Sequence, residues 1–167
     1  NTISTQSWLK LASVFAKEQG GSVRYTEVSA AALANLDPER HWSVKIGGYG
    51  RVSLTGKDLD VDPFAIGGQD SVRGYTAASI AGQQGHAIQA ELRFRPAIQE
   101  SLPMDLMAFW DSGKAYSSEE SKSISSAGIG LQARLTHQLS FELIYSRQLK
   151  LQEAQPNRWM ARLSAYW

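Results

Sequence analysis

The chain has 167 residues, which is long enough for one domain with a sizeable core. Seventeen Lys and Arg residues against 16 Asp and Glu residues leave a formal charge of +1, so charge does not favour a nucleic-acid partner. The absence of cysteine excludes disulfides, thiolate metal sites and cysteine nucleophiles. No apolar run approaches the roughly 20 residues of a membrane helix, and we expect any export signal to lie outside these residues.

The first part of the chain predicts three strands. They cover residues 7–17, 22–36 and 42–54. The third is the most regular, with Trp42 and Ile46 on one face and Lys45 and Arg51 on the other. This alternation is the period of a β-strand, because successive side chains point to opposite sides of a sheet.

The stretch GGQDSVRGYTAASIAGQQG, which starts at Gly67, breaks this alternation. It is rich in glycine, serine and alanine, yet it carries Arg73 where a plain turn would suffice. Gly67, Gly68 and Gly74 permit a tight backbone path. The sequence therefore predicts a long loop over residues 58–85.

The rest of the chain predicts five more strands. They cover residues 86–96, 106–116, 127–135, 139–148 and 158–167. In the last of them, Trp159 and Leu163 share one face, and Arg158 and Arg162 share the other. About eight strands, mostly joined by short turns and without a convincing helix, predict an all-β antiparallel meander.

Alternation does not by itself separate a soluble barrel from a membrane barrel, because either is apolar on one face. Two features favour a transmembrane β-barrel. Charged residues lie on the polar face within strands, at Arg51, Glu91, Arg93, Arg95, Arg134, Glu142 and Arg162. Aromatic residues gather near strand ends, as in an interfacial girdle, at Trp42, Trp110, Tyr116, Tyr145, Trp159 and Trp167. A lipocalin-like soluble barrel is the alternative.

Three motifs together resemble one superfamily of outer-membrane proteins. They are Val72-Arg73-Gly74-Tyr75, the F-x-D-x-G pattern of Phe109, Asp111 and Gly113, and a final strand ending in the aromatic Trp167. This combination is similar to the outer-membrane assembly and secretion superfamily. The compact loop ending in GQQG most resembles its two-partner secretion transporters of the haemolysin secretion and activation type.

The resemblance implies a location in the outer membrane of a Gram-negative bacterium. Residues 1–167 would be the C-terminal half of a sixteen-stranded barrel, with loop 58–85 folded inward from the extracellular side. The implied function is export of a large unfolded exoprotein, such as an adhesin, haemolysin or contact-dependent toxin, without a cofactor. Implied partners are this exoprotein, outer-membrane lipid and lipopolysaccharide, and the barrel-assembly machinery that recognises Trp167.

Strand parity supplies an expectation for Arg73. If Trp110 faces lipid, Asp111 faces the lumen, and Glu91 falls on the inward parity of its own strand. A guanidinium suits bidentate pairing in a partly dehydrated place, so we expect Arg73 to lock the loop through Asp111 and Glu91. The resemblance links this inward loop, including Val72, Gly74 and Tyr75, to transport or assembly competence.

Each of these three residues also has a plainer interpretation. Arg73 could be a solvated charge on a surface loop. Asp111 could be a turn residue in the sequence DSG. Glu91 could pair only with nearby cations, namely Arg93, Arg95 or Arg134.

The sequence is also compared with two other functional classes, a barrel-assembly insertase and an enzyme. A barrel-assembly insertase would show a similar loop and aspartate strand. An enzyme is disfavoured because His41, His86 and His137 lie on separate turns or strand ends, and no G-x-S-x-G motif occurs. The carboxylates in KDLDVDP lack the glycine and glutamate of a calcium loop, so we expect no metal site.

Overall fold

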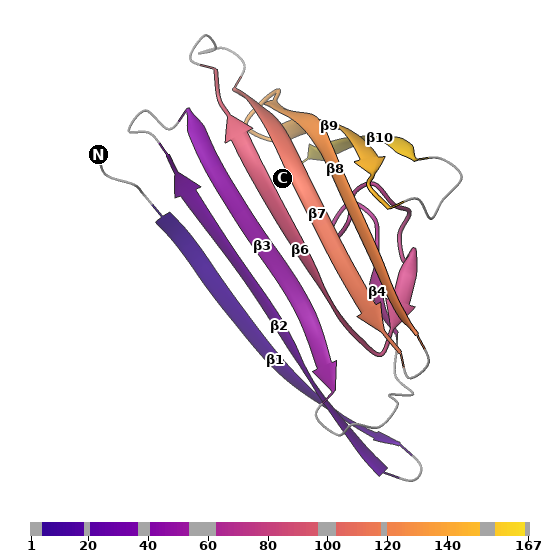
Figure 1. Ribbon diagram of the computed structural model, residues 1–167. Coiled ribbons are helices and arrows are strands. Elements are labelled where there is room, and N and C mark those ends of the chain that lie inside the picture. The colour runs from indigo at the N-terminus through magenta and orange to yellow at the C-terminus, as the bar shows by residue number, and fades with distance from the viewer. Residues whose placement is uncertain are drawn as a thin grey trace.

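The computed structural model describes residues 5–18, 21–36, 41–53, 63–96, 103–117, 120–150 and 156–165. These residues form an all-β fold in which eight strands make one antiparallel sheet (Figure 1). Its order is β1 (Thr5–Glu18), β2 (Gly21–Asn35), β3 (Trp42–Ser53), β6 (Gln84–Phe94), β7 (Met104–Tyr116), β8 (Ser121–Arg134), β9 (Leu139–Gln148) and β10 (Asn157–Ala165). The antiparallel all-β prediction is confirmed. None of the described residues forms a helix that could cross a membrane.

The two faces of the sheet differ in composition, as the alternation predicted. Large apolar side chains on the outward face are solvent-exposed, among them Ile129 at 63%, Trp159 at 67% and Leu163 at 66%. Several charged and polar side chains on the inward face are buried instead, including Asp111 and Ser126 at 0%. A soluble barrel has the opposite arrangement, with its apolar face packed inside.

A segment between β3 and β6, residues 63–83, folds back against the inward face; we call it the inward loop. It contains a small hairpin of β4 (Phe64–Ile66) and β5 (Ile80–Gly82). This hairpin contacts β6, β7 and β8, and β9 and β10 curve over the same side of the sheet (Figure 1). Buried apolar residues of the loop and the strands form a common core there, at Phe64, Ile66, Val72, Tyr75, Ile80, Ala87, Ala115 and Ile124.

Positive backbone torsions allow the loop to turn after β4. Gly67 has φ of +125° and Gly68 has φ of +94°, a region that side chains with a Cβ rarely adopt. A Cβ on Gly68 would also lie 3.3 Å from the Cα of Ala77. The turn therefore requires glycine for conformation, and the loop can cross back over itself within a few residues.

Two boundaries and one short hairpin near the loop differ from the sequence prediction. The loop ends earlier than residue 85, because Gln84 and Gly85 already pair with Tyr116 and Ala115 of β7. β8 begins at Ser121, six residues before its predicted start, because the serine-rich segment continues the ladder with β7 despite its weak alternation. The β4–β5 hairpin was not predicted. The start of the expected loop, residues 58–62, lies outside the described residues.

The sheet has two edges, β1 and β10. Among the described residues, no strand pairing joins one edge to the other. Each edge presents unpaired backbone groups, which in a barrel bind the next strand. The expected terminal signal, Trp167, lies outside the described residues.

Candidate functional site

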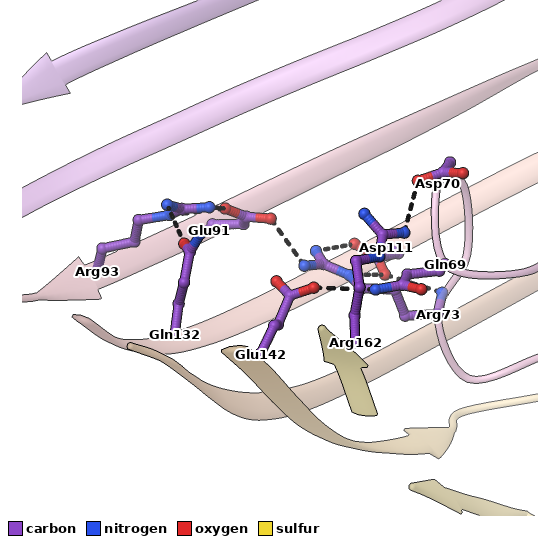
Figure 2. Close-up of polar contacts among 9 residues, drawn as sticks. All are labelled: Gln69, Asp70, Arg73, Glu91, Arg93, Asp111, Gln132, Glu142 and Arg162. Carbon is purple, nitrogen blue, oxygen red and sulfur yellow. Dashed lines mark hydrogen bonds and ion pairs between the residues drawn. The ribbon is translucent and has the colours of Figure 1, made fainter. Parts of the chain in front are cut away.

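The inward loop is held to the sheet by one buried guanidinium. The Arg73 side chain donates two hydrogen bonds to the Asp111 carboxylate, at 2.8 Å and 2.6 Å, and a third to Glu91 Oε1 at 2.7 Å (Figure 2). The Arg73 backbone N–H also donates to Asp111. Arg73 is 3% exposed, Asp111 0% and Glu91 8%. We call these three residues the Arg73 clamp.

The strands explain why the two carboxylates converge. Asp111 lies in the middle of β7, and Glu91 lies on the neighbouring strand β6 opposite Phe109. Both side chains point to the inward face, because they share the parity of the buried residues of their strands. Asp111 is therefore not a turn residue at a strand end, and Arg73 is not a solvated surface charge.

An aromatic ring completes the surroundings of the guanidinium. The Cζ atom of Arg73 lies 3.7 Å from the ring centroid of Phe109, a cation–π arrangement. The ring in turn occupies space left by Gly128 on β8, where an added Cβ would lie 2.5 Å from Phe109 Cζ. Burial opposes the charge of Arg73, yet hydrogen bonds to Asp111 and the attraction of both carboxylates raise the arginine pKa above its usual value. Both carboxylates lie within ion-pair distance of the guanidinium, at 2.6 Å for Asp111 and 2.7 Å for Glu91.

Glu91 has a second cationic partner. Its Oε2 atom accepts two hydrogen bonds from Arg93, at 2.9 Å and 2.6 Å, while Arg93 also donates to Gln132 at 3.3 Å (Figure 2). Glu91 therefore does not pair only with strand cations, because it binds both Arg93 of its own strand and Arg73 of the loop. One carboxylate links the loop arginine to a charged network further along the inward face.

The other motif residues fit around the clamp by close packing. Val72 is fully buried beside Gly113, where an added Cβ would lie 3.3 Å from Val72 Cγ2 and 2.6 Å from Ile66 Cγ2. Gly74 approaches β8 so closely that its own added Cβ would lie 2.6 Å from Ser126 Cβ. Gly74 thus allows the loop backbone to approach β8 closely, whereas Gly67 and Gly68 allow the positive φ values of the turn.

Polar groups of β8 and β9 bind the loop backbone on either side of Arg73. The Gly74 N–H donates to Ser126 Oγ at 3.1 Å, and Gln148 Nε2 donates to the Gly74 carbonyl at 3.0 Å. Ser146 Oγ donates to the Arg73 carbonyl at 3.1 Å. The buried Tyr75 hydroxyl donates to the carbonyl of Ser125 at 3.3 Å and to that of Lys150. These bonds satisfy backbone groups that burial would otherwise leave unpaired.

The tip of the loop makes more exposed contacts. Gln69 Nε2 donates to Glu142 of β9 at 2.9 Å, and Arg162 of β10 lies 3.3 Å from Asp70 (Figure 2). The Arg162 and Asp70 side chains are 45% and 93% exposed. Loop contacts therefore extend from β6 to β10.

The chain matches a family model over residues 23–135, which is more than half of its length. The family is described as haemolysin secretion/activation protein ShlB/FhaC/HecB. The chain belongs to this family. No individual curated protein matches the chain. The match includes the inward loop, all three clamp residues and β8 up to Arg134, so the family assignment covers the site just described.

Membership of the haemolysin secretion/activation family sets the functional class. The family suggests a transporter role in two-partner secretion rather than an enzymatic one, and its name implies a secreted partner protein. Among the described residues, no group of three or more His, Cys, Asp or Glu side chains is placed to hold a metal ion. His41, His86 and His137 lie apart on three different segments.

Several loop-binding residues of this family member were missed from the sequence. Ser126, Ser146 and Gln148 are buried polar residues on the inward face, and Gly128 makes room for Phe109. All four lie at alternate positions that face inward on β8 and β9, so the alternation along each strand could have marked them as candidates. Register was the missing information: Ser126 pairs with Asp111 and Gln148 in one row beneath the loop, and Gly128 pairs with Phe109 and Ser146 in the next.

Proposed function

We propose that this chain is part of an outer-membrane barrel that exports a large unfolded exoprotein, such as an adhesin, haemolysin or contact-dependent toxin, by two-partner secretion. The observation that carries the proposal is the buried Arg73 clamp, which holds a loop against the polar inward face of a sheet whose outward face is apolar. Membership of the haemolysin secretion/activation family supports this functional class.

The outward face supports placement in a bilayer. Its exposed side chains include Ile46, Trp110 and Leu163, each between 45% and 66% accessible. Such a continuous apolar surface is unfavourable in water and suits lipid. Trp42 and Phe94, with ring centroids 4.6 Å apart, lie near one end of the sheet, where an interfacial aromatic belt belongs. Outer-membrane lipid and lipopolysaccharide are the proposed surroundings, and Trp167 the proposed signal for the barrel-assembly machinery.

The direction of the strands supplies an orientation. The inward loop leaves the sheet where β3 ends and β6 begins; we call this the loop end and propose that it faces the cell exterior. The opposite end, where β6 ends and β7 begins, then faces the periplasm. An exoprotein would enter at the opposite end, pass along the polar inward face and leave beside the loop.

The clamp gives the loop a defined position in this path. The cost of burying three charges is offset only while all three remain paired with good geometry. The loop is therefore held in one place. Because the loop covers part of the inward face, the clamp determines how much of that face is open to a passing chain. No nucleotide or other cofactor is required for such an arrangement.

The test is export by the complete transporter with Arg73→Ala. We expect secretion of the partner protein to be abolished, because two buried carboxylates lose their shared cation and the loop loses its position. Insertion into the membrane should persist, and we would check it by the shift in gel mobility of the barrel on boiling. Arg162→Ala, which removes an exposed loop contact, is the control. Undiminished secretion by Arg73→Ala would contradict the proposed role of the clamp.

A further inference from the structure

A cavity lies on the inward side of the sheet, at the end opposite to the loop end. It has a volume of about 780 Å³ and is bounded by the last residues of β6 and β8 and the first residues of β7 and β9. Three arginines line it, Arg93, Arg95 and Arg134, together with His137. We call this cavity and its lining the basic pocket.

The carboxylates of the described residues do not balance these cations. Asp105, the acidic residue of the lining, is bound by Arg95 through two hydrogen bonds at 2.6 Å and 2.9 Å. Glu91 binds Arg93 but is shared with Arg73 of the clamp. Within the part of the chain that the structure describes, the exposed Arg134 side chain has no carboxylate within ion-pair distance. Counted over the described residues alone, the lining of the pocket thus carries more positive than negative charge.

The pocket is not isolated on the inward face, because it adjoins another cavity. A second cavity of about 230 Å³ shares Arg93, Arg95 and Asp105 with it and continues along the sheet toward β2 and β3. A compact anion would be surrounded on several sides, whereas a groove along successive strand ends suits an extended polymer. The inward position also separates the pocket from the outward apolar face, where lipid would lie.

We propose that the basic pocket is an entry site that recognises acidic segments of the exported polypeptide. This inference rests on the proposed function, and it names the substrate chemistry. Carboxylate side chains of an unfolded chain would pair with Arg134 and with Arg95, whose planar guanidinium groups donate bidentate hydrogen bonds. The Arg95 side chain is 56% exposed and that of Asp105 19%, so an incoming carboxylate can reach the Arg95 guanidinium beside Asp105.

Weak, exchangeable binding is what a transit site needs. A site on a conduction path must attract its substrate and then release it. Positive charge in a recessed site raises the local concentration of acidic segments and speeds their encounter, and salt screens this attraction. The partly buried Arg93–Glu91 pair keeps the wall of the pocket in place while Arg95 and Arg134 bind and release carboxylates.

The experiment measures peptide binding to the complete transporter in lipid nanodiscs. The probes are fluorescein-labelled decapeptides of alternating Glu and Gly, Ser and Gly, or Lys and Gly, followed by fluorescence anisotropy, with empty nanodiscs subtracted. We expect the Glu peptide to bind best and to weaken at high salt. Arg134→Glu should weaken its binding about tenfold, as expected when a unit attraction becomes a repulsion in a wet site.

Lys122→Glu is the matched control, because Lys122 also lies on the inward parity of β8, but near the loop end and paired with exposed Glu120. It should leave peptide binding unchanged. Equal binding of the three peptides, or an equal loss in Lys122→Glu, would overturn the proposal. The proposed function can fail separately: if Arg73→Ala still exports while Arg134→Glu loses peptide binding, the pocket stands and the role of the clamp falls.

Discussion

The inward loop is held by the same chemistry in two very different surroundings. At the clamp, Arg73 binds Asp111 and Glu91 where all three are nearly inaccessible to solvent. At the tip, Arg162 faces Asp70 where the aspartate side chain is 93% exposed. A buried ion pair cannot lose one partner without leaving an uncompensated charge, whereas an exposed pair exchanges readily with water. Burial, rather than the number of ion pairs, should decide which contacts hold the loop.

The largest effect is expected from Asp111→Ala. It removes the carboxylate that binds Arg73 through two side-chain bonds and one backbone bond, and breaking a buried pair costs about 3–5 kcal/mol. The released loop should expose the peptide bond after Arg73 to trypsin, followed as a new fragment on a gel. Asp105→Ala, which removes the partner of the more exposed Arg95, is the matched control. An Asp111→Ala loop as resistant as wild type would break the distinction between buried and exposed pairs.

An intermediate effect is expected from Gly128→Ala. The new methyl group would lie 2.5 Å from Phe109 Cζ and too close to the Tyr145 carbonyl, so the ring must move off the guanidinium. Overpacking of this kind costs about 1–3 kcal/mol, which is less than loss of a clamp carboxylate. Partial trypsin cleavage and slower export should follow.

Gly47→Ala is the matched control for Gly128→Ala. Gly47 also lies on inward parity, on β3, but the atoms nearest its added Cβ are 3.7 Å away, an ordinary contact. Export by Gly47→Ala should match wild type. If Gly47→Ala and Gly128→Ala impaired export equally, the packing of Phe109 on Arg73 would not be the cause.

The smallest effect is expected from Asp70→Asn. The substitution removes the charge that faces Arg162 but keeps the size of the side chain, and it leaves the Gln69–Glu142 bond in place. Loop protection from trypsin should be unchanged at low and high salt. Cleavage comparable to that of Asp111→Ala would show that the tip, and not the clamp, holds the loop.

The alternation of apolar and polar residues was enough to predict the strands and their faces. It was not enough to predict which residues of different strands meet at the site. Trp110 and Asp111 are neighbours, and period two alone places one outside and the other inside. Register is different, because it depends on pairing between distant segments and a slip of one residue reverses every side chain. The row formed by Asp111, Ser126 and Gln148 is a consequence of register, and no single strand reveals it.

Weak local patterns account for the remaining differences. Ser121 to Ser126 lack clear alternation, because this part of β8 faces the loop on one side with residues as different as Ile124 and Ser126. The β4–β5 hairpin is only three residues long on each side, too short for periodicity to detect. Both features are determined by the loop that packs there, so they follow from tertiary contacts and not from local sequence.

Cysteine labelling measures most directly whether Arg73 keeps the loop against the inward face of the sheet. Ser71 is 4% exposed, so a Ser71→Cys reporter in this cysteine-free segment should react slowly with a membrane-impermeant maleimide added outside cells. Ala77→Cys, at an exposed position of the same loop, should react rapidly throughout. Adding Arg73→Ala to the Ser71→Cys reporter should raise its labelling toward the rate of Ala77→Cys. Labelling of Ser71→Cys that stays slow without Arg73 would show that Arg73 does not hold the loop against the sheet.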